Sequence, residues 1–440
     1  MTATISSSWR RPVIWAAIPM VLGAGRAIDH ISVALPSIRG EHDVQIHELL
    51  WVVLAYAVSQ AVVVVAAGRV GDRVGRRPVF MAGLVVVAFG AAAAAAAPGH
   101  GWLVAARVVE GVGAGILISG SFAIVRDAVP VEMLGRAFGL WAMVVGLGAL
   151  VGPVLNGALT HNGSWRWVLG INAALSLVAL VLTPRFLPGG KPSTTVRPSI
   201  GRVLRSENYV VATSLIGLVY ALLGLMAFAL TFYLYTIHGS TALEIGLVFA
   251  AYGLVYLTLT PFTGKLADRI GVRTPILIGL AFLFVGMVVF SFAADANNLF
   301  LSVIALAGVA AGVAFIAPAT NSAAFRQIHV EDRSDASGLF WTGRLLGNAI
   351  GVAIAAFMLR SFSETTKPEF GVPAGYDSAA VRIWTVGAVV TVVAVIVTLA
   401  FVRTSASNAD AGRDSRRNGT VRGPLSESPQ SDGPRPSGGN

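Results

Sequence analysis

The chain has 440 residues, of which 55% are hydrophobic and only 12% are charged. Ordinary soluble domains contain roughly 25% charged residues, so this composition excludes a soluble globular protein. The absence of Cys excludes disulfides, thiol nucleophiles and thiolate metal sites, and the seven His residues lack a metal-binding spacing, so we expect no bound metal.

Apolar runs of about twenty residues recur along the sequence, and each is long enough to cross a hydrocarbon core of roughly 30 Å. One such run could be buried in a soluble core, but a series of them indicates a membrane protein. Breaks in hydrophobicity predict helices near 12–38, 48–68, 78–97, 102–125, 136–160, 167–187, 209–236, 243–264, 274–294, 299–320, 335–360 and 380–402. The predicted fold is therefore all-α, with twelve transmembrane helices.

The net charge of +10 would suggest a nucleic-acid partner for a soluble protein, so the placement of the basic residues decides its meaning. With a cytoplasmic N-terminus, most of the 32 Lys and Arg residues fall on the inner side of the membrane. The outer loops then hold only Arg39, Arg166, Arg360, Lys367 and Arg382. This bias predicts a multi-pass protein of the cell membrane, with both termini in the cytoplasm and no nucleic-acid partner.

The predicted helices divide into two similar halves. Residues 188–208 lie in a basic stretch rich in Pro, Ser and Gly without a spanning segment, which predicts a cytoplasmic linker. The clearest internal repeat pairs GRVGDRVG at 68–75 with GKLADRIG at 264–271. We therefore expect six-helix bundles at 1–187 and 209–403, related by a pseudo-twofold axis along the membrane normal, with a substrate site between them near the midplane. The polar residues 404–440 predict a disordered cytoplasmic tail.

Four charged residues lie inside predicted helices of the N-terminal half. Arg26 and Asp29 share one face of the first helix, and Arg107 and Glu110 share one face of the fourth. Because the two helices run antiparallel, a rise of 1.5 Å per residue places Asp29 level with Arg107, and Arg26 level with Glu110. A charge inside a membrane helix costs at least ~2.5 kcal/mol, so these residues are functional candidates. We expect two ion pairs, which either couple to protons, since protonating an acid releases an arginine, or hold the half together permanently.

Residues 68–77 resemble the loop 2–3 signature of the major facilitator superfamily. The glycines would permit a tight inner turn, an Asp would meet a helix N-terminus, and the arginines would pair with acids that separate when the halves rock. The residues assigned to this gating loop are Gly68, Asp72, Arg73, Gly75, Arg76, Arg77, Asp268 and Arg269. The alternative is a simple topology anchor, for which arginines alone would suffice. The recurrence of the motif in the second half favours gating.

Two more motifs resemble the drug:proton antiporters of this superfamily. The segment from Leu103 through Arg107 and Glu110 to Ala114 is similar to their Arg-containing motif, with Glu110 where the group usually has Gln. The segment that ends at Asn172 also resembles sequences of this group. In the superfamily, helices 1, 4, 7 and 10 face a central cavity. The resemblance therefore implies that one site, containing the four buried charges, exchanges a proton for substrate.

A pattern in the predicted fifth helix resembles the motif found in exporters rather than importers. Its residues are Gly148, Gly152, Pro153 and Gly157. Such glycines allow close helix approach and an interior Pro bends a helix, so plain packing is the alternative. The resembling group commonly has fourteen spans, but the stretch 185–208 cannot span a membrane, so a twelve-span relative is the better description.

The C-terminal half has aromatic residues and one deep charge inside its predicted helices. We assign to a substrate pocket the residues Tyr220, Tyr233, Trp341, Arg344 and Asn348. Each aromatic side chain alone could serve packing or contact lipid. Together with Arg344 they indicate a pocket that is apolar on one side and ionic on the other, which suits amphipathic organic molecules.

The sequence thus predicts a proton-coupled secondary transporter that exports a small amphipathic molecule by alternating access. Its partners would be the small-molecule substrate, protons and membrane lipid, and we expect a monomer. The driving force would be the proton gradient without a cofactor, because no GK[ST] phosphate loop is present. One alternative is a proton-coupled uptake symporter for a metabolite or organic anion, and another is a non-transporting membrane sensor with the same fold. No constellation of catalytic residues indicates an enzyme.

Overall fold

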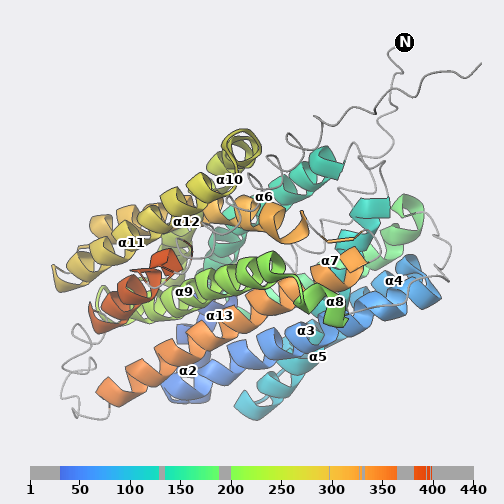
Figure 1. Cartoon of the computed structure of the whole chain (residues 1–440). Helices are drawn as coiled ribbons and strands as arrows, with labels where there is room; N and C mark the ends of the chain where they lie inside the picture. The colour runs from blue at the N-terminus through green and yellow to red at the C-terminus, as the bar shows by residue number, and fades with distance from the viewer. Residues whose placement is uncertain are drawn as a thin grey trace, which may run out of the picture. The chain divides into compact units, whose positions relative to one another are not determined.

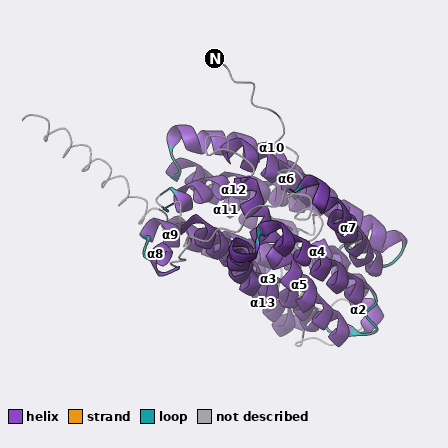
Figure 2. Ribbon diagram, turned by 90° about the vertical axis from the view of Figure 1, so that its right-hand side faces the viewer, coloured by secondary structure: helices purple, strands orange, loops and turns teal. Residues whose placement is uncertain are grey.

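The computed structural model describes residues 30–127, 134–187, 200–296, 298–326, 328–329, 332–363, 381–392, 394–396 and 398. Throughout these residues the secondary structure is helical, joined by short loops (Figure 2). Residues up to Val395 form one unit and those from Ile396 onward a second, of which only Ile396 and Thr398 are described. The first predicted helix is described only from His30, and the predicted tail lies outside the described residues.

The helices follow the predicted segments closely. Before the linker they are η3 (His30–Ala34), α2 (Leu35–His42), α3 (Ile46–Val74), α4 (Arg76–Ala95), α5 (His100–Asp127), α6 (Leu134–Asn162) and α7 (Trp165–Phe186). After it they are α8 (Ile200–Leu204), α9 (Glu207–Thr236), α10 (Ala242–Ile270), α11 (Arg273–Asp295), α12 (Leu299–Phe325) and α13 (Arg333–Ser363). An apolar helical stretch at Val381–Ile396 matches the last predicted span. The short helix α8, inside the predicted linker, was not expected from the sequence.

The internal repeat is visible in how the helices begin and end. A capping box, in which two side chains bond reciprocally to backbone N–H groups, opens both α3 and α10. It is formed by Gln45 and Glu48 in the first half and by Thr241 and Glu244 in the second. Each of these helices ends at a glycine with positive φ, 111° at Gly75 and 84° at Gly271. The same sequence offset relates both pairs of signals, so the repeat is also structural.

The packing of the helices obeys the same repeat. In the first half α5 packs against both α3 and α4, and in the second half α12 packs against both α10 and α11 (Figure 1). The repeat places α3 onto α10 and α6 onto α13. Accordingly, the contact of α3 with α13 is matched by a contact of α10 with α6. These two seams join the halves, and their exchange under the repeat is what a pseudo-twofold axis requires.

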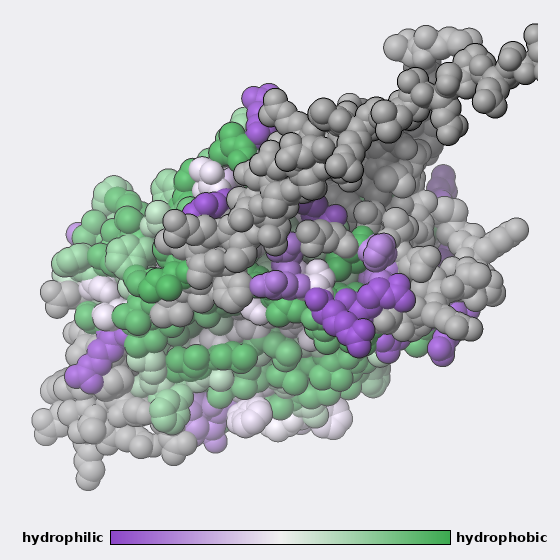
Figure 3. All heavy atoms as spheres, in the orientation of Figure 1, coloured by the Kyte–Doolittle hydropathy of each residue, from purple (hydrophilic) through white to green (hydrophobic). Residues whose placement is uncertain are grey.

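The surface of the helices is apolar. Large hydrophobic side chains project outward along them, and Phe89, Phe262 and Phe357 are 67%, 68% and 70% exposed. On the face shown in Figure 3, hydrophobic residues cover most of the described helices and hydrophilic residues gather in patches. Nine of the described helices are long and apolar enough to span a bilayer. An exposed apolar surface of this extent is unfavourable in water and is the form that a lipid-facing bundle takes.

Candidate functional site

A buried charged network lies on α5, where it meets α3 and α7. Arg107 Nη1 donates to Glu110 Oε2 at 2.7 Å, and both side chains are only 1% exposed. The second carboxylate oxygen of Glu110, Oε1, accepts a hydrogen bond from Asn172 Nδ2 at 2.7 Å. Arg107 Nε donates to the Val52 carbonyl oxygen at 3.1 Å, and its guanidinium carbon lies 4.0 Å from the ring centre of Tyr56. Both oxygens of the carboxylate are therefore engaged by protein donors.

Glycines bring the backbones close enough to bury this network. A Cβ atom at Gly90 of α4 would lie 2.5 Å from the backbone nitrogen of Glu110. A Cβ at Gly111 of α5 would lie closer to Ser59 Oγ and to the Tyr56 carbonyl oxygen than non-bonded atoms can approach. No real side chain tolerates such contacts, so α3, α4 and α5 approach this closely only because these positions lack a Cβ. The dry surroundings strengthen the electrostatic interactions of the pair.

The network contains one ion pair that the sequence did not predict. Arg107 pairs with Glu110 three residues further along the same helix. Arg26 and Asp29 lie outside the described residues. The cross-helix pairs Asp29 with Arg107 and Arg26 with Glu110 therefore stay predictions. Asn172 belongs to a motif of the sequence analysis, which assigned no role to it. In the structure its amide donates a hydrogen bond to Glu110.

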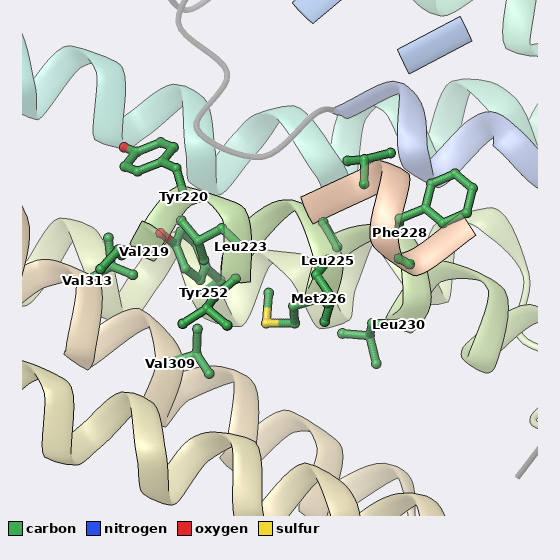
Figure 4. Packing of buried hydrophobic residues seen from close by; sticks show 14 of the residues in the cluster. Val219, Tyr220, Leu223, Leu225, Met226, Phe228, Leu230, Tyr252, Val309 and Val313 are labelled. Atoms are coloured by element: carbon green, nitrogen blue, oxygen red, sulfur yellow. The ribbon is translucent and has the colours of Figure 1, made fainter. Parts of the chain in front are cut away.

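A second buried cation lies in the other half, on α13. Arg344 is 7% exposed, and its Nη2 donates to the Tyr220 hydroxyl of α9. Its guanidinium carbon lies 4.3 Å from the ring centre of Tyr220 and 4.3 Å from that of Trp341. Tyr252 and Tyr256 of α10 stack with ring centres 6.0 Å apart and lie within electrostatic range of Arg344. Figure 4 shows Tyr252 among aliphatic side chains of α9 and α12, while the ring of Tyr220, on α9, points away from them.

The predicted pocket residues are only partly brought together. Tyr220, Trp341 and Arg344 form one cluster. Asn348 lies one helical turn further along α13, where a Cβ at Gly224 of α9 would be 2.9 Å from its Oδ1. Tyr233 is separate, since it lies about 20 Å from Tyr220 along α9, where its hydroxyl donates to the Ala293 carbonyl at 3.4 Å. Tyr252 and Tyr256 complete the cluster in its place.

The two charged clusters lie at the same level of the bundle. Glu110 is about 15 Å along α5 from its first residue, and Arg344 is about 17 Å along α13 from its first residue. Each therefore lies near the middle of a hydrocarbon core of roughly 30 Å. Tyr56, which stacks on Arg107, and Trp341, which stacks on Arg344, belong to the same buried apolar cluster. The two arginines thus flank one region between the halves.

The predicted gating loop is more helical than its glycines suggested. Gly68, Arg69 and Asp72 all lie within α3, and the turn itself is made at Gly75. Asp72 pairs with Arg76 across this turn at 2.8 Å. Arg73 is exposed and Arg77 is half-buried. In the second half, Arg269 is equivalent to Arg73 and is also exposed, and the side chain of Asp268 lies outside the described residues.

The ion pair that joins the two halves here involves residues outside the predicted set. Arg69 Nε of α3 lies 3.4 Å from Asp335 Oδ1 of α13. One turn earlier, Arg202 of α8 pairs with the buried Asp332 at 3.3 Å. No specific signal in the sequence marked these acids, because an Asp near a helix start is ordinarily a cap. Their position opposite two arginines is what distinguishes them.

The predicted exporter motif lies on the seam between α6 and α10. A Cβ at Gly157 would lie 2.5 Å from the Ala242 carbonyl oxygen, and one at Gly246 would meet the Pro153 carbonyl. Further along, Gly253 of α10 packs directly on the backbone of Leu150. Gly148 is buried and Gly152 half-buried in the same helix. Glycines from both helices thus form this seam, and α6 continues through Pro153 to Asn162.

These features define a multi-pass membrane protein with buried ionisable groups at its centre. The sequence matches the Major Facilitator Superfamily over residues 16–239 and 211–430. The chain therefore belongs to this superfamily, and it has the superfamily's fold of twelve helices in two bundles. It is a transporter and not an enzyme.

Individual relatives share a modest part of the sequence. The multidrug resistance protein Stp of Mycobacterium tuberculosis is 26% identical over 394 residues, which cover 76% of this chain and 73% of that protein. The riboflavin transporter RibZ of Clostridioides difficile is 22% identical over 430 residues, covering 85% and 93% of the two chains. The crystal structure of a bacterial homolog of the human lysosomal transporter Spinster, inward-facing and unoccupied, superposes with a TM-score of 0.74 at 17% identity, over 91% of this chain and 98% of that one. This last likeness concerns the fold alone.

Proposed function

We propose that the protein is a proton-coupled exporter of small amphipathic organic molecules, located in the cell membrane with both termini in the cytoplasm. Most basic residues lie in segments that would then be cytoplasmic, which supports this orientation. The observation that carries the proposal is the buried network of Arg107, Glu110 and Asn172 near the middle of the bundle. An ionisable acid at this depth is costly and usually marks an ion pathway.

Glu110 would be the proton-binding residue. When ionised, its carboxylate is held by Arg107 and Asn172, and the pair is neutral. A proton on a carboxylate oxygen would neutralise Glu110 and leave the Arg107 charge without its partner, which favours a different arrangement of α3, α5 and α7. Binding of a proton and binding of substrate would then stabilise different states of the bundle, which is the requirement for exchange.

The direction of transport rests on two supports. The α6 pattern that resembles the exporter motif packs along the α6–α10 seam between the halves, where the gating movement has to occur. In addition, a relative that matches most of this chain is called a multidrug resistance protein. An amphipathic substrate suits the cluster of Arg344, Tyr220 and Trp341 on α9 and α13, because aromatic rings and a cation meet there.

The test uses full-length protein in proteoliposomes loaded with an amphipathic fluorescent dye, with and without an imposed pH gradient. We expect the wild type to move the dye against its gradient when protons flow the opposite way. Glu110→Gln should abolish the dependence on the gradient while leaving downhill exchange measurable. The control is Glu207→Gln, which removes an exposed acid at the start of α9.

Two results would contradict the proposal. Undiminished gradient-driven transport by Glu110→Gln would exclude Glu110 as the coupling residue. Accumulation of the dye in the same direction as proton flow would identify a symporter, and export would then be wrong.

A further inference from the structure

We propose that Arg344 binds an anionic group, such as a carboxylate, of an aromatic substrate that packs against Tyr220 and Trp341. This inference rests on the proposed function and specifies its substrate class. It assigns a recognition role to the C-terminal half, whereas proton binding was assigned to the N-terminal half.

The first observation is that Arg344 has no acidic partner among the described residues. It is more than nine-tenths buried, and its contacts among the described residues are the Tyr220 hydroxyl and the faces of Tyr220 and Trp341. Its Nε, a strong donor, has no hydrogen-bond partner within the described part of the chain. Arg107, at the same level, has a carboxylate at 2.7 Å. A buried guanidinium without a counter-ion is unfavourable unless a ligand supplies the charge.

The second observation is the chemistry around this cation. A guanidinium presents a planar fork of N–H donors that matches the two oxygens of a carboxylate. The Tyr252 hydroxyl lies in the same cluster and has no hydrogen-bond partner in the described residues, so it is a further donor for an anion. The aromatic rings that flank Arg344 offer flat apolar surfaces to the rest of the ligand. An aromatic organic anion satisfies all three groups, whereas a cation would be repelled by Arg344.

An anionic substrate also agrees with the direction of exchange. Export of an anion and entry of a proton both move positive charge inward, so a membrane potential that is negative inside drives both steps. The substrate and the proton would occupy different residues, Arg344 and Glu110. Exchange would then depend on which of the two ligands is bound when the bundle changes state.

The test measures equilibrium binding by full-length protein in lipid nanodiscs, without a pH gradient. Three fluorescent probes share one aromatic body and differ in charge: pyrenebutyrate, pyrenebutanol and trimethyl(pyrenebutyl)ammonium. We expect the wild type to bind the carboxylate about tenfold or more tightly than the alcohol, as a hydrogen-bonded ion pair supplies that difference. The cationic probe should bind most weakly.

Substitutions assign this preference to one residue. Arg344→Gln should bind the carboxylate and the alcohol equally, with the affinity for the alcohol unchanged, which also shows that the variant is folded. Arg344→Lys, which keeps the charge and loses the planar fork, should retain part of the preference. Arg326→Gln, which removes an exposed arginine at the end of α12, should behave as the wild type.

The outcomes separate this inference from the proposed function. Equal binding of the charged and neutral probes by the wild type, preference for the cation, or an anion preference that survives Arg344→Gln would overturn the inference. Proteoliposomes loaded with the same probes then test transport independently. Gradient-driven export of the carboxylate probe that is insensitive to Arg344→Gln leaves the exporter intact and rejects the anion site. Arg344-dependent binding without gradient-driven export supports the site and rejects proton coupling.

Discussion

At the scale of single residues, the most informative group is the carboxylate of Glu110. Its two oxygens accept from two different helices' side chains, Arg107 on its own helix and Asn172 on α7. Hydrogen bonds to an ionised carboxylate stabilise the charged form against the protonated one. Asn172 therefore holds the ionised carboxylate of Glu110 from a second helix.

Replacing Asn172 with Leu should weaken gradient-driven transport. The substitution removes the donor to Oε1 of the buried Glu110 carboxylate, and the loss of a hydrogen bond to a charged group costs about 1.5–3 kcal/mol, so the initial rate of gradient-driven dye transport should fall about tenfold or more. Initial rates in wild-type and variant proteoliposomes measure this loss. Ser176→Ala is the control, because Ser176 lies one turn along the same helix and its hydroxyl donates to the Asn172 carbonyl at 2.8 Å. An undiminished rate in Asn172→Leu would show that the amide does not support the function of Glu110.

At the scale of secondary-structure elements, glycines decide how closely the helices pack. Gly253 of α10 shows this most clearly, since a Cβ there would overlap the backbone of Leu150 in α6. Gly170 in α7 is the opposite case, because a Cβ there meets nothing within 4 Å. Replacing either glycine with alanine is therefore the same chemical change in very different surroundings.

Gly253→Ala and Gly170→Ala should accordingly have opposite effects on stability. The first forces α6 and α10 apart and should destabilise the fold by about 1–3 kcal/mol. The second places a Cβ on a half-buried glycine where there is room for it, and it reduces the conformational freedom of the unfolded chain, so it should be neutral or stabilising by up to about 1 kcal/mol. Thermal unfolding of both variants in the same detergent measures the difference. A Gly253→Ala protein as stable as Gly170→Ala would mean that the α6–α10 seam yields without cost.

The elements were predictable to a degree that the site was not. Runs such as 274–294 coincide with α11 because a membrane helix must be apolar throughout its length, and hydropathy alone locates it. The short helix α8 lacks such a run, so hydropathy does not locate it. It packs beside the start of α13, where Arg202 forms an ion pair with Asp332. Arg107 and Glu110 were found because charge is rare at that depth. Their pairing along one helix, and the role of Asn172, depend on how α5 and α7 pack, which composition does not specify.

At the scale of the whole molecule, the seam between α3 and α13 joins the two halves on one side of the charged clusters. Along this seam Arg69 first forms an ion pair with Asp335. Gly338 then packs on Val65, and further along Thr342 Oγ1 donates a hydrogen bond of 3.1 Å to the Ala61 carbonyl. These contacts join segments on opposite sides of the linker. Rocking of the two bundles has to break them, because packed interfaces switch between discrete arrangements instead of stretching.

A disulfide across this seam should arrest transport. A Cβ built at Gly338 lies 3.7 Å from the Cβ of Val65, within the separation that a disulfide requires. The chain has no Cys of its own, so the pair Val65→Cys with Gly338→Cys can be oxidised without competing thiols. We expect oxidation to reduce dye transport to background and a reducing agent to restore it, while each single variant stays insensitive to oxidant. Full transport by completely cross-linked protein would show that the α3–α13 seam stays closed throughout the cycle, and alternating access would then have to be carried by the α6–α10 seam alone.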